Sequence, residues 1–346
     1  MDRQAPRRRR QAPRGAVQAR HRARGDDRGP EPRGDRAGRG RVTALAIKAG
    51  GYQPPASIHN QAARRLGELL AQKLGDRIGF ELIPSVLDLG RPSADLPVMV
   101  EKGELSLCYM STVRFSRDVP ELALLELPFV VRDRATVWRA LDGALGDRFV
   151  RRMHATTPFR VLGRWDNGFR HLTNKVRPIR RPDDCRGLRI RTQGSALHGE
   201  VFRALGFVPM AIDIKRFVQE VGGDTVDAHD NPLTSIYVFG VHKYHRHITL
   251  TGHFFGASFL LCNASHYESW PDDVRRAVDE AAREATTLQR RLAISEDQEV
   301  LAKLDPRENE VVHLTPAEHA AFVDAVRPVR ARLERDFDPT LLAGLS

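Results

Sequence analysis

The chain has 346 residues and 41% hydrophobic side chains, which is enough for two ordinary domains with separate cores. Its formal net charge of +11 would indicate a nucleic-acid or anionic-membrane partner if the charge covered a folded surface. However, residues 1–41 hold 14 Arg and five acids and carry +9 of this charge, which leaves only +2 for residues 42–346. The composition therefore excludes a strongly basic folded body.

Residues 1–41 are predicted to form a disordered, Arg-rich extension, because they contain too few apolar side chains to build a core. They hold no aromatic residue for stacking on bases, so we expect no nucleic-acid partner. They also lack the apolar stretch of a working signal peptide, and a start codon placed too far upstream is an alternative explanation for the segment. Since no run of about 18 apolar residues occurs, no direct membrane insertion is expected.

Strands and helices alternate from residue 42 onward. An apolar strand over residues 42–47 is followed by a helix over residues 57–74, whose leucines share one face and which Gly75 ends. The next strand spans Phe80–Ile83. Strand, helix and strand in succession are typical of a parallel sheet with helices packed on its faces.

The same alternation continues through two further blocks and ends in a long helix. The first block is predicted to contain a helix at 96–102, a strand at 105–110, a helix at 135–152 and a strand at 160–163. The second contains a strand at 188–191, helices at 196–205 and 215–221, and a strand from Asp227. From Ser269 onward, apolar residues repeat at helical spacing through Leu304, which predicts one long helix or two joined end to end. Two α/β lobes with more than one crossing between them are the simplest interpretation.

Enzyme motifs are largely missing from the sequence, so we expect neither catalytic residues nor a cofactor. Five histidines fall between residues 229 and 253, at positions 229, 242, 245, 247 and 253. His242 and His245 could approach one metal ion, but no carboxylate or cysteine completes a ligand set, so we interpret the group as solvated histidines in a basic loop. Cys108, Cys185 and Cys262 are too few and too scattered for a disulfide framework, and the first and last are interpreted as core residues.

Two arginines stand at the ends of predicted strands. Burying Arg170 or Arg191 there would cost free energy unless an anion pairs with it, because a guanidinium group stays protonated. An ordinary salt bridge or a surface position is the alternative for each arginine taken alone.

The segments around these arginines resemble the solute-binding proteins of tripartite ATP-independent periplasmic (TRAP) transporters, the dicarboxylate-binding DctP-like family. The similar motifs are Gly168–Arg170, Arg177–Ile179, Asp184–Arg191, Ala204–Pro209, Asp227–Pro232, the long helix from Ser269, and upstream Lys102–Leu105 and Glu126–Phe129. They cover about residues 42 to 335 in the family's order.

The resemblance implies a set of substrate-binding residues. Arg191 corresponds to the arginine that forms a bidentate salt bridge with the substrate carboxylate, Arg170 to a second cationic contact, and Asn231 to a hydrogen-bonding one. By position alone, the first lobe would add Tyr52, Gln53, Ser111 and Arg114. Residues 227–230 depart from the family's pattern on this wall, and Asn231 argues against a substrate-bridging metal. Trp165 and Phe254 or Phe255 are candidates for the lining, but as single residues they are interpreted as core.

The resemblance also implies an α/β, two-lobed periplasmic-binding-protein-like fold with hinge strands and a long C-terminal bracing helix. We expect residues 42–165 to form mainly lobe 1, residues 166–265 mainly lobe 2 with crossover strands, and residues 266–346 the long helix and tail. The expected function is capture of a small organic acid in an interlobe cleft by a periplasmic monomer, which hands it to the transporter's membrane components. A sensory or cytoplasmic carboxylate-binding module and a metal-dependent enzyme are the alternatives.

Overall fold

The computed structural model describes residues 44–345, and the predictions for residues 1–41 lie outside this range. The first elements are β1 (Leu45–Gly50), α1 (Ile58–Leu74), β2 (Ile78–Ile83), α2 (Leu96–Glu101) and β3 (Leu107–Ser111). β1 pairs in parallel with both β2 and β3, as the alternation of strand and helix predicted. Local signals set the ends of α1, because Ser57 Oγ accepts a hydrogen bond from Asn60 N at 3.2 Å and Gly75, at φ 56°, follows its last turn.

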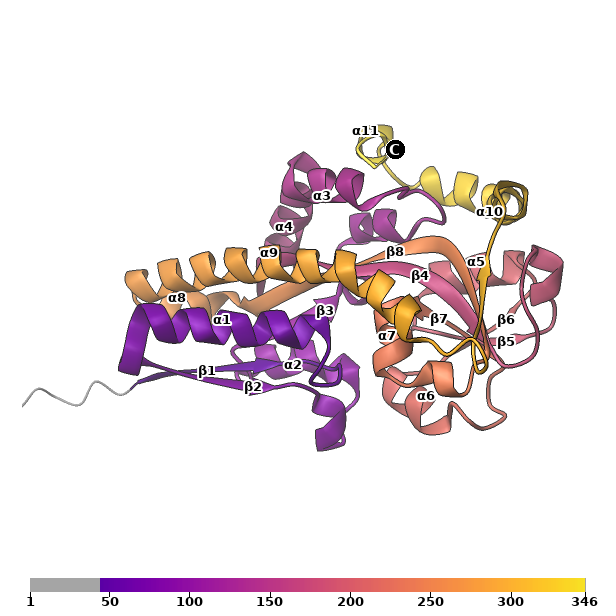
Figure 1. Cartoon of the computed structure of the whole chain (residues 1–346). Helices are drawn as coiled ribbons and strands as arrows, with labels where there is room; N and C mark the ends of the chain where they lie inside the picture. The colour runs from indigo at the N-terminus through magenta and orange to yellow at the C-terminus, as the bar shows by residue number, and fades with distance from the viewer. Residues whose placement is uncertain (1–43, 346) are drawn as a thin grey trace, which may run out of the picture. The chain divides into compact units, whose positions relative to one another are not determined.

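All strands of the described range belong to one mixed sheet of nine strands, in the order β2-β1-β3-β8-β4-β7-β5-β6, with β9 paired to β8. Its centre is an antiparallel ribbon of two long strands, β4 (Phe159–Asn174) and β8 (His247–Asn263). β3 pairs with the C-terminal part of β8, whereas β7 (Ala228–Pro232) pairs with the C-terminal part of β4. The ribbon therefore joins two halves of the sheet (Figure 1).

The half beyond the ribbon is built from residues after 188. It contains β5 (Arg189–Thr192), α5 (Ala196–Ala204), β6 (Val208–Ala211), α6 (Ile214–Glu220), β7 and α7 (Leu233–Val238). The remaining elements are α8 (Ala264–Ser269), α9 (Asp272–Lys303), β9 (Glu310–His313), α10 (Pro316–Glu334) and α11 (Pro339–Ala343). None of the helices in residues 44–345 is long and apolar enough to cross a membrane.

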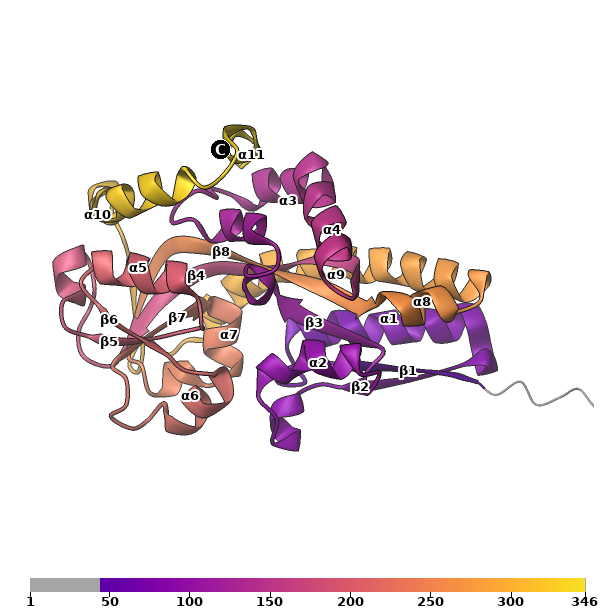
Figure 2. The same ribbon diagram turned by 180° about the vertical axis from the view of Figure 1, so that it is seen from behind.

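α9 is one continuous helix of 32 residues, which settles the choice between one helix and two. Its buried face presents small side chains, including Ala281, Ala282 and Ala285, so that α1 and β4 pack closely against it. Figures 1 and 2 both show α9 running alongside α1.

The single helix predicted for residues 135–152 is wrong, because two helices, α3 (Arg134–Asp142) and α4 (Ala144–Thr156), occupy this segment. Gly143 lies between them in an extended conformation, with φ −106° and ψ −155°. Apolar residues continue on both sides of the break, from Val137 and Leu141 to Leu145 and Phe149, and therefore the periodicity does not reveal it.

The interpretation of the histidine group as solvated is also wrong for four of its five members, since only His242 is partly exposed. His229, His245, His247 and His253 are buried in or beside β7 and β8, and His229 stacks on Phe217 with ring centroids 4.2 Å apart. The lysine and arginine side chains next to these histidines suggested a loop and are exposed, but the four imidazole rings are buried. No group of three His, Cys, Asp or Glu side chains within residues 44–345 is arranged to hold a metal ion.

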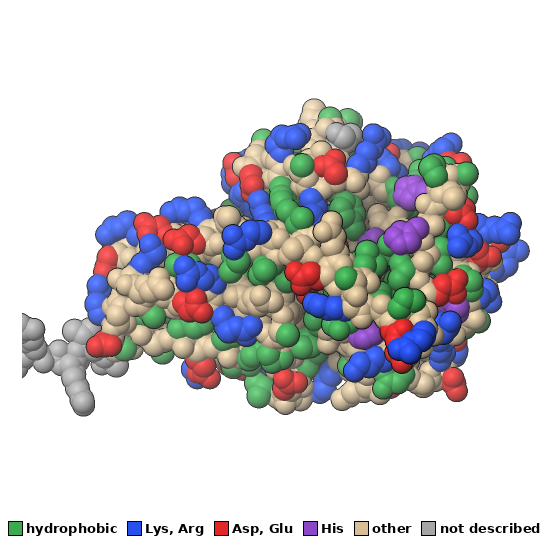
Figure 3. Space-filling model, in the orientation of Figure 1, with side chains coloured by type: hydrophobic (Ala, Val, Ile, Leu, Met, Phe, Trp, Pro, Cys, Tyr) green, Lys and Arg blue, Asp and Glu red, His purple; other side chains and the backbone are tan. Residues whose placement is uncertain are grey.

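The predicted α/β class is confirmed, and the cysteines are free and buried as expected for Cys108 and Cys262. Trp165, Phe254 and Phe255 are core residues. On the face shown in Figure 3, basic and acidic side chains are interspersed, which agrees with the nearly neutral charge of the chain beyond residue 41.

Candidate functional site

A cavity lies where the two halves of the sheet meet, and most of the sequence-predicted site residues line it. Those residues are Tyr52, Ser111, Arg114, Arg170, Arg191 and Asn231. Tyr52 follows β1 and Ser111 ends β3, while Arg191 lies in β5 and Asn231 in β7, near the ends of these strands. In open α/β sheets, ligands bind beyond the carboxyl ends of parallel strands. The fold thus gathers residues that are up to 179 positions apart in the chain, from Tyr52 to Asn231.

Arg191 is a buried cation without an acidic partner. Its side chain is 4% exposed, and Nε donates a hydrogen bond to the backbone oxygen of Ile212 at 2.7 Å. Its guanidinium also lies 5.7 Å from the ring centroid of Phe217. Burial lowers the pKa of Arg191 to about 10, and no carboxylate among residues 44–345 forms an ion pair with it. A buried charge of this kind is costly until an anion compensates it.

Arg170, in contrast, is neutralised by the chain itself. Its Nε lies 2.5 Å from Asp230 Oδ2, its Nη2 donates to the Asp230 backbone oxygen at 2.7 Å, and its Nη1 donates to Asn231 Oδ1 at 3.1 Å. Burial opposes ionisation of Asp230, but the adjacent Arg170 outweighs it and holds the pKa of Asp230 well below its usual range. The sequence reasoning missed Asp230, although it directly precedes Asn231 in the same motif.

Glycine allows this part of β4 to approach β7. Gly168 has φ 98°, and a Cβ placed on it would lie 3.0 Å from the Pro232 side chain. The glycine of the Gly168–Arg170 motif therefore allows the backbone geometry that precedes Arg170.

Arg114 has an acidic partner as well, but at the edge of the cavity. Its Nη2 lies 3.5 Å from Asp213 Oδ2, and Ser93 Oγ donates to the same oxygen at 3.1 Å. Asp213 also caps α6, because its Oδ1 accepts a hydrogen bond from Lys215 N at 2.9 Å. Both charged side chains of this pair are about a quarter exposed, so water screens the pair more than it screens Arg170 and Asp230.

Gln53 does not line the cavity but is buried behind Tyr52. The backbone N–H groups of both residues donate to the Tyr109 hydroxyl, at 3.3 Å from Tyr52 and 3.2 Å from Gln53. The Gln53 backbone oxygen accepts from Asn60 Nδ2 at 2.7 Å. This network fixes the turn that presents Tyr52, whose pKa burial raises.

The remaining lining residues were not predicted from the sequence. They are Ser93, Met110, Asn167, Gln193, Ile214, Ser235 and Phe239. For two of them the sequence contains a signal that could have identified them. Asn167 directly precedes the Gly168–Arg170 motif, and Gln193 lies two residues after Arg191, on the same side of the extended chain. Ser111 Oγ and Asn167 Oδ1 are buried without a hydrogen-bond partner in the described part of the chain. The cavity therefore offers a single unpaired cation and unused polar atoms around it.

Comparisons with known proteins agree with this architecture. The family model described as "Bacterial extracellular solute-binding protein, family 7" (DctP) matches residues 49–336. A solute-binding protein of Verminephrobacter eiseniae is 30% identical over 70% of this chain and 72% of its own length. The 2,3-diketo-L-gulonate-binding periplasmic protein of Escherichia coli is 26% identical over 82% of this chain and 85% of its own length.

A solved structure has the same fold. A TRAP periplasmic solute-binding protein of Shewanella oneidensis with bound succinate superposes with a TM-score of 0.83, at 22% identity, over 87% of this chain and 98% of that protein. The family model covers well over half of the chain, and the order of the sequence motifs agrees with it. The chain therefore belongs to the DctP family of TRAP-type bacterial extracellular solute-binding proteins, as its motifs predicted.

Proposed function

We propose that this protein is the periplasmic solute-binding subunit of a TRAP transporter and that it holds a small organic acid through a salt bridge between Arg191 and the acid's carboxylate. The observation that carries the proposal is the isolation of Arg191, which is 4% exposed at the cavity and, within residues 44–345, has only a backbone oxygen as its hydrogen-bond partner. A bidentate carboxylate matches the planar guanidinium and supplies the missing negative charge.

The other cavity residues have supporting roles in this proposal. Asn231, Ser111 and Tyr52 offer polar groups to the ligand, while Arg114 and Arg170 contact it from positions that their own acids already neutralise. Gln53 acts indirectly by holding the turn at Tyr52. The names of similar proteins include a diketo-gulonate-binding one and a succinate-bound one, which supports an organic acid as the ligand class.

Closure around the ligand is part of the proposal. We assign residues 42–165 mainly to one lobe, residues 166–265 mainly to the other and residues 266–346 to the brace, so that the β4–β8 ribbon acts as the hinge. Ligand binding would then favour the closed form, and the membrane components of the transporter would recognise that form. Three contacts already join the two sides of the cavity mouth: Lys215 to the Gly90 oxygen, and Asp213 to both Ser93 and Arg114.

The test uses two arginines of the same strand. A thermal-shift screen of organic acids first identifies a ligand, and calorimetry then compares Arg191→Ala with Arg189→Ala. Arg189 is a matched control because it is ion-paired with Asp227 and does not line the cavity. We expect Arg191→Ala to weaken binding by about 2–5 kcal/mol, which is roughly 30-fold or more, and Arg189→Ala to retain the affinity. Equal affinities in the two variants would refute the assignment of Arg191.

A further inference from the structure

The cavity contains three arginines, and their pairing fixes how much negative charge a ligand can bring. Arg170 is paired with Asp230, and Arg114 is paired with Asp213. Arg191 has no acidic partner among residues 44–345. The other lining residues are uncharged, since they are polar, apolar or, for Tyr52, a phenol whose pKa is raised by burial. The three lining arginines counted together with Asp213 and Asp230 therefore carry a net charge of +1.

A ligand with one carboxylate balances this charge, whereas a dicarboxylate exceeds it. The second carboxylate of a dianion would meet guanidinium groups whose charge is already compensated, and it would also approach Asp213 or Asp230. Uncompensated charge is strongly disfavoured where water is excluded, because ionic solvation is lost without a matching attraction. The buried pair of Arg170 and Asp230 cannot open for the second carboxylate without leaving Asp230 as a buried anion whose remaining neighbour, His253 at 3.4 Å, has a pKa lowered by burial.

Neutral polar groups in the wall indicate what the rest of the ligand carries. Ser111 and Asn167 are each 5% exposed, and no other residue described in the structure forms a hydrogen bond with Ser111 Oγ or Asn167 Oδ1. A buried polar atom without a partner costs free energy, so a fitting ligand supplies one. A hydroxyl group both donates and accepts, and therefore it can pair with the serine and with either end of the asparagine amide.

From the charge balance and these atoms we infer that the ligand is a hydroxy monocarboxylate, and that Asp213 is a specificity-determining residue that excludes dicarboxylates by neutralising Arg114. This inference rests on the proposed function, because it requires that Arg191 binds a carboxylate. Asp213 is the acid that can be tested, because it lies at the edge of the cavity. Its side chain is partly exposed, so water can solvate the site after the carboxylate has been replaced.

The first experiment measures affinities by calorimetry for pairs of acids with four to six carbons. Each pair matches a hydroxy monocarboxylate with the hydroxy dicarboxylate of the same chain length, for example erythronate with malate and gluconate with glucarate. We expect binding of at least one monocarboxylate and binding about 100-fold weaker, or absent, for its dicarboxylate partner. A dicarboxylate that binds as tightly as its partner and depends on Arg191 would overturn the inference and leave the proposed function intact. Failure of every acid to bind would overturn both.

The second experiment changes the charge balance directly. Asp213→Asn frees Arg114, while the asparagine retains the ability to cap α6. We expect the preference for the monocarboxylate over its dicarboxylate partner to shrink by about tenfold or more, because the cavity then carries one additional positive charge. Asp183→Asn is the control, since Asp183 forms an exposed pair with Arg186 and should leave the preference unchanged. The same preference in Asp213→Asn and in the control would refute the role of Asp213.

Discussion

Arg170 and Arg191 differ in their surroundings, although the sequence presents them alike. Each is the last residue of a short motif, and sequence reasoning could select both as anion-binding candidates. It could not separate them, because the partner of Arg170 lies 60 positions away and reaches it only through the pairing of β4 with β7, in which Leu172 is opposite Asp230. Electrostatic pairing between distant segments is a property of the sheet register, which a single sequence does not show.

Removal of the paired arginine should affect stability far more than removal of a surface arginine. Arg170→Met removes the cation paired with buried Asp230 and leaves only His253, whose pKa burial lowers, beside this carboxylate, so we expect the free energy of unfolding to fall by about 3–5 kcal/mol. Arg186→Met removes an exposed pair with Asp183 and should cost about 1 kcal/mol or less. Denaturant unfolding of both variants gives the comparison, and similar losses would contradict the described pairing.

At the scale of single elements, prediction succeeded where the chain carries local signals. α1 begins and ends within one residue of the predicted range because Ser57 and Gly75 act on their own neighbours. The strand predicted at residues 160–163 is only the start of β4, because register shifts near Gly163, Gly168 and Leu172 interrupt the alternation that would show a long strand. The break between α3 and α4 depends on one glycine inside a regular apolar pattern.

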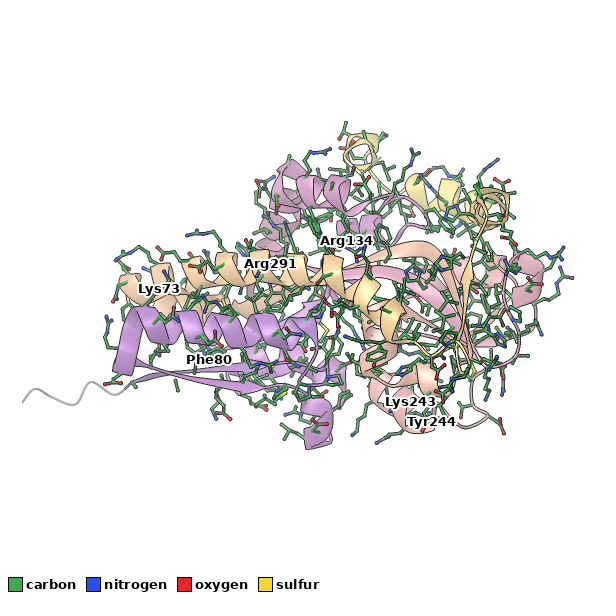
Figure 4. The ribbon with its side chains drawn as sticks, in the orientation of Figure 1. Lys73, Phe80, Arg134, Lys243, Tyr244 and Arg291 are labelled. Carbon is green, nitrogen blue, oxygen red and sulfur yellow. The ribbon has the colours of Figure 1, made fainter. Side chains whose placement is uncertain are left out.

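The packing of α1 on β2 gives a prediction in which two effects oppose each other. Gly67→Ala should favour the helix by about 1 kcal/mol, because alanine has the higher helix propensity. However, the new Cβ would overlap the ring of Phe80, which lies against α1 (Figure 4). Overpacking typically costs about 1–3 kcal/mol, so we expect net destabilisation in thermal or denaturant unfolding.

A double mutant identifies the cause of that loss. Once Phe80→Ala has removed the ring, adding Gly67→Ala should stabilise the protein, since only the propensity gain remains. A loss of the same size in both backgrounds would show that the ring is not the cause.

At the scale of the whole molecule, buried neutral histidines make the stability depend on pH. Burial lowers the pKa of His59 to about 3 and that of His245 to about 4, and both side chains are inaccessible to solvent. In the unfolded chain each takes up a proton near pH 6.5, whereas in the folded chain each stays neutral to a much lower pH. The stability is therefore fully present above about pH 6.5 and falls as the pH decreases toward 4, by roughly 1.4 kcal/mol per pH unit for each histidine.

This dependence can be assigned to a residue by unfolding the protein at several pH values between 7 and 5. His59 packs against Tyr109 and Trp165, with ring centroids 5.0 and 5.8 Å away, so phenylalanine can replace it in an aromatic cluster. His59→Phe should reduce the slope of the unfolding free energy with pH by one proton, or about 1.4 kcal/mol per pH unit. Parallel curves for the wild type and the variant would show that His59 does not contribute.

The position of α9 near the end of the chain has a consequence for synthesis. Leu66 and Leu70 of α1 share a core with Val278 and Ala281 of α9, and β3 is paired with β8. Within residues 45–111, β1 pairs with β2 and β3, but residues 247–303 continue the sheet and complete the core. Non-local contacts form slowly, and those partners leave the ribosome late in synthesis. This half of the sheet and its core therefore stay incomplete until most of the chain has been made.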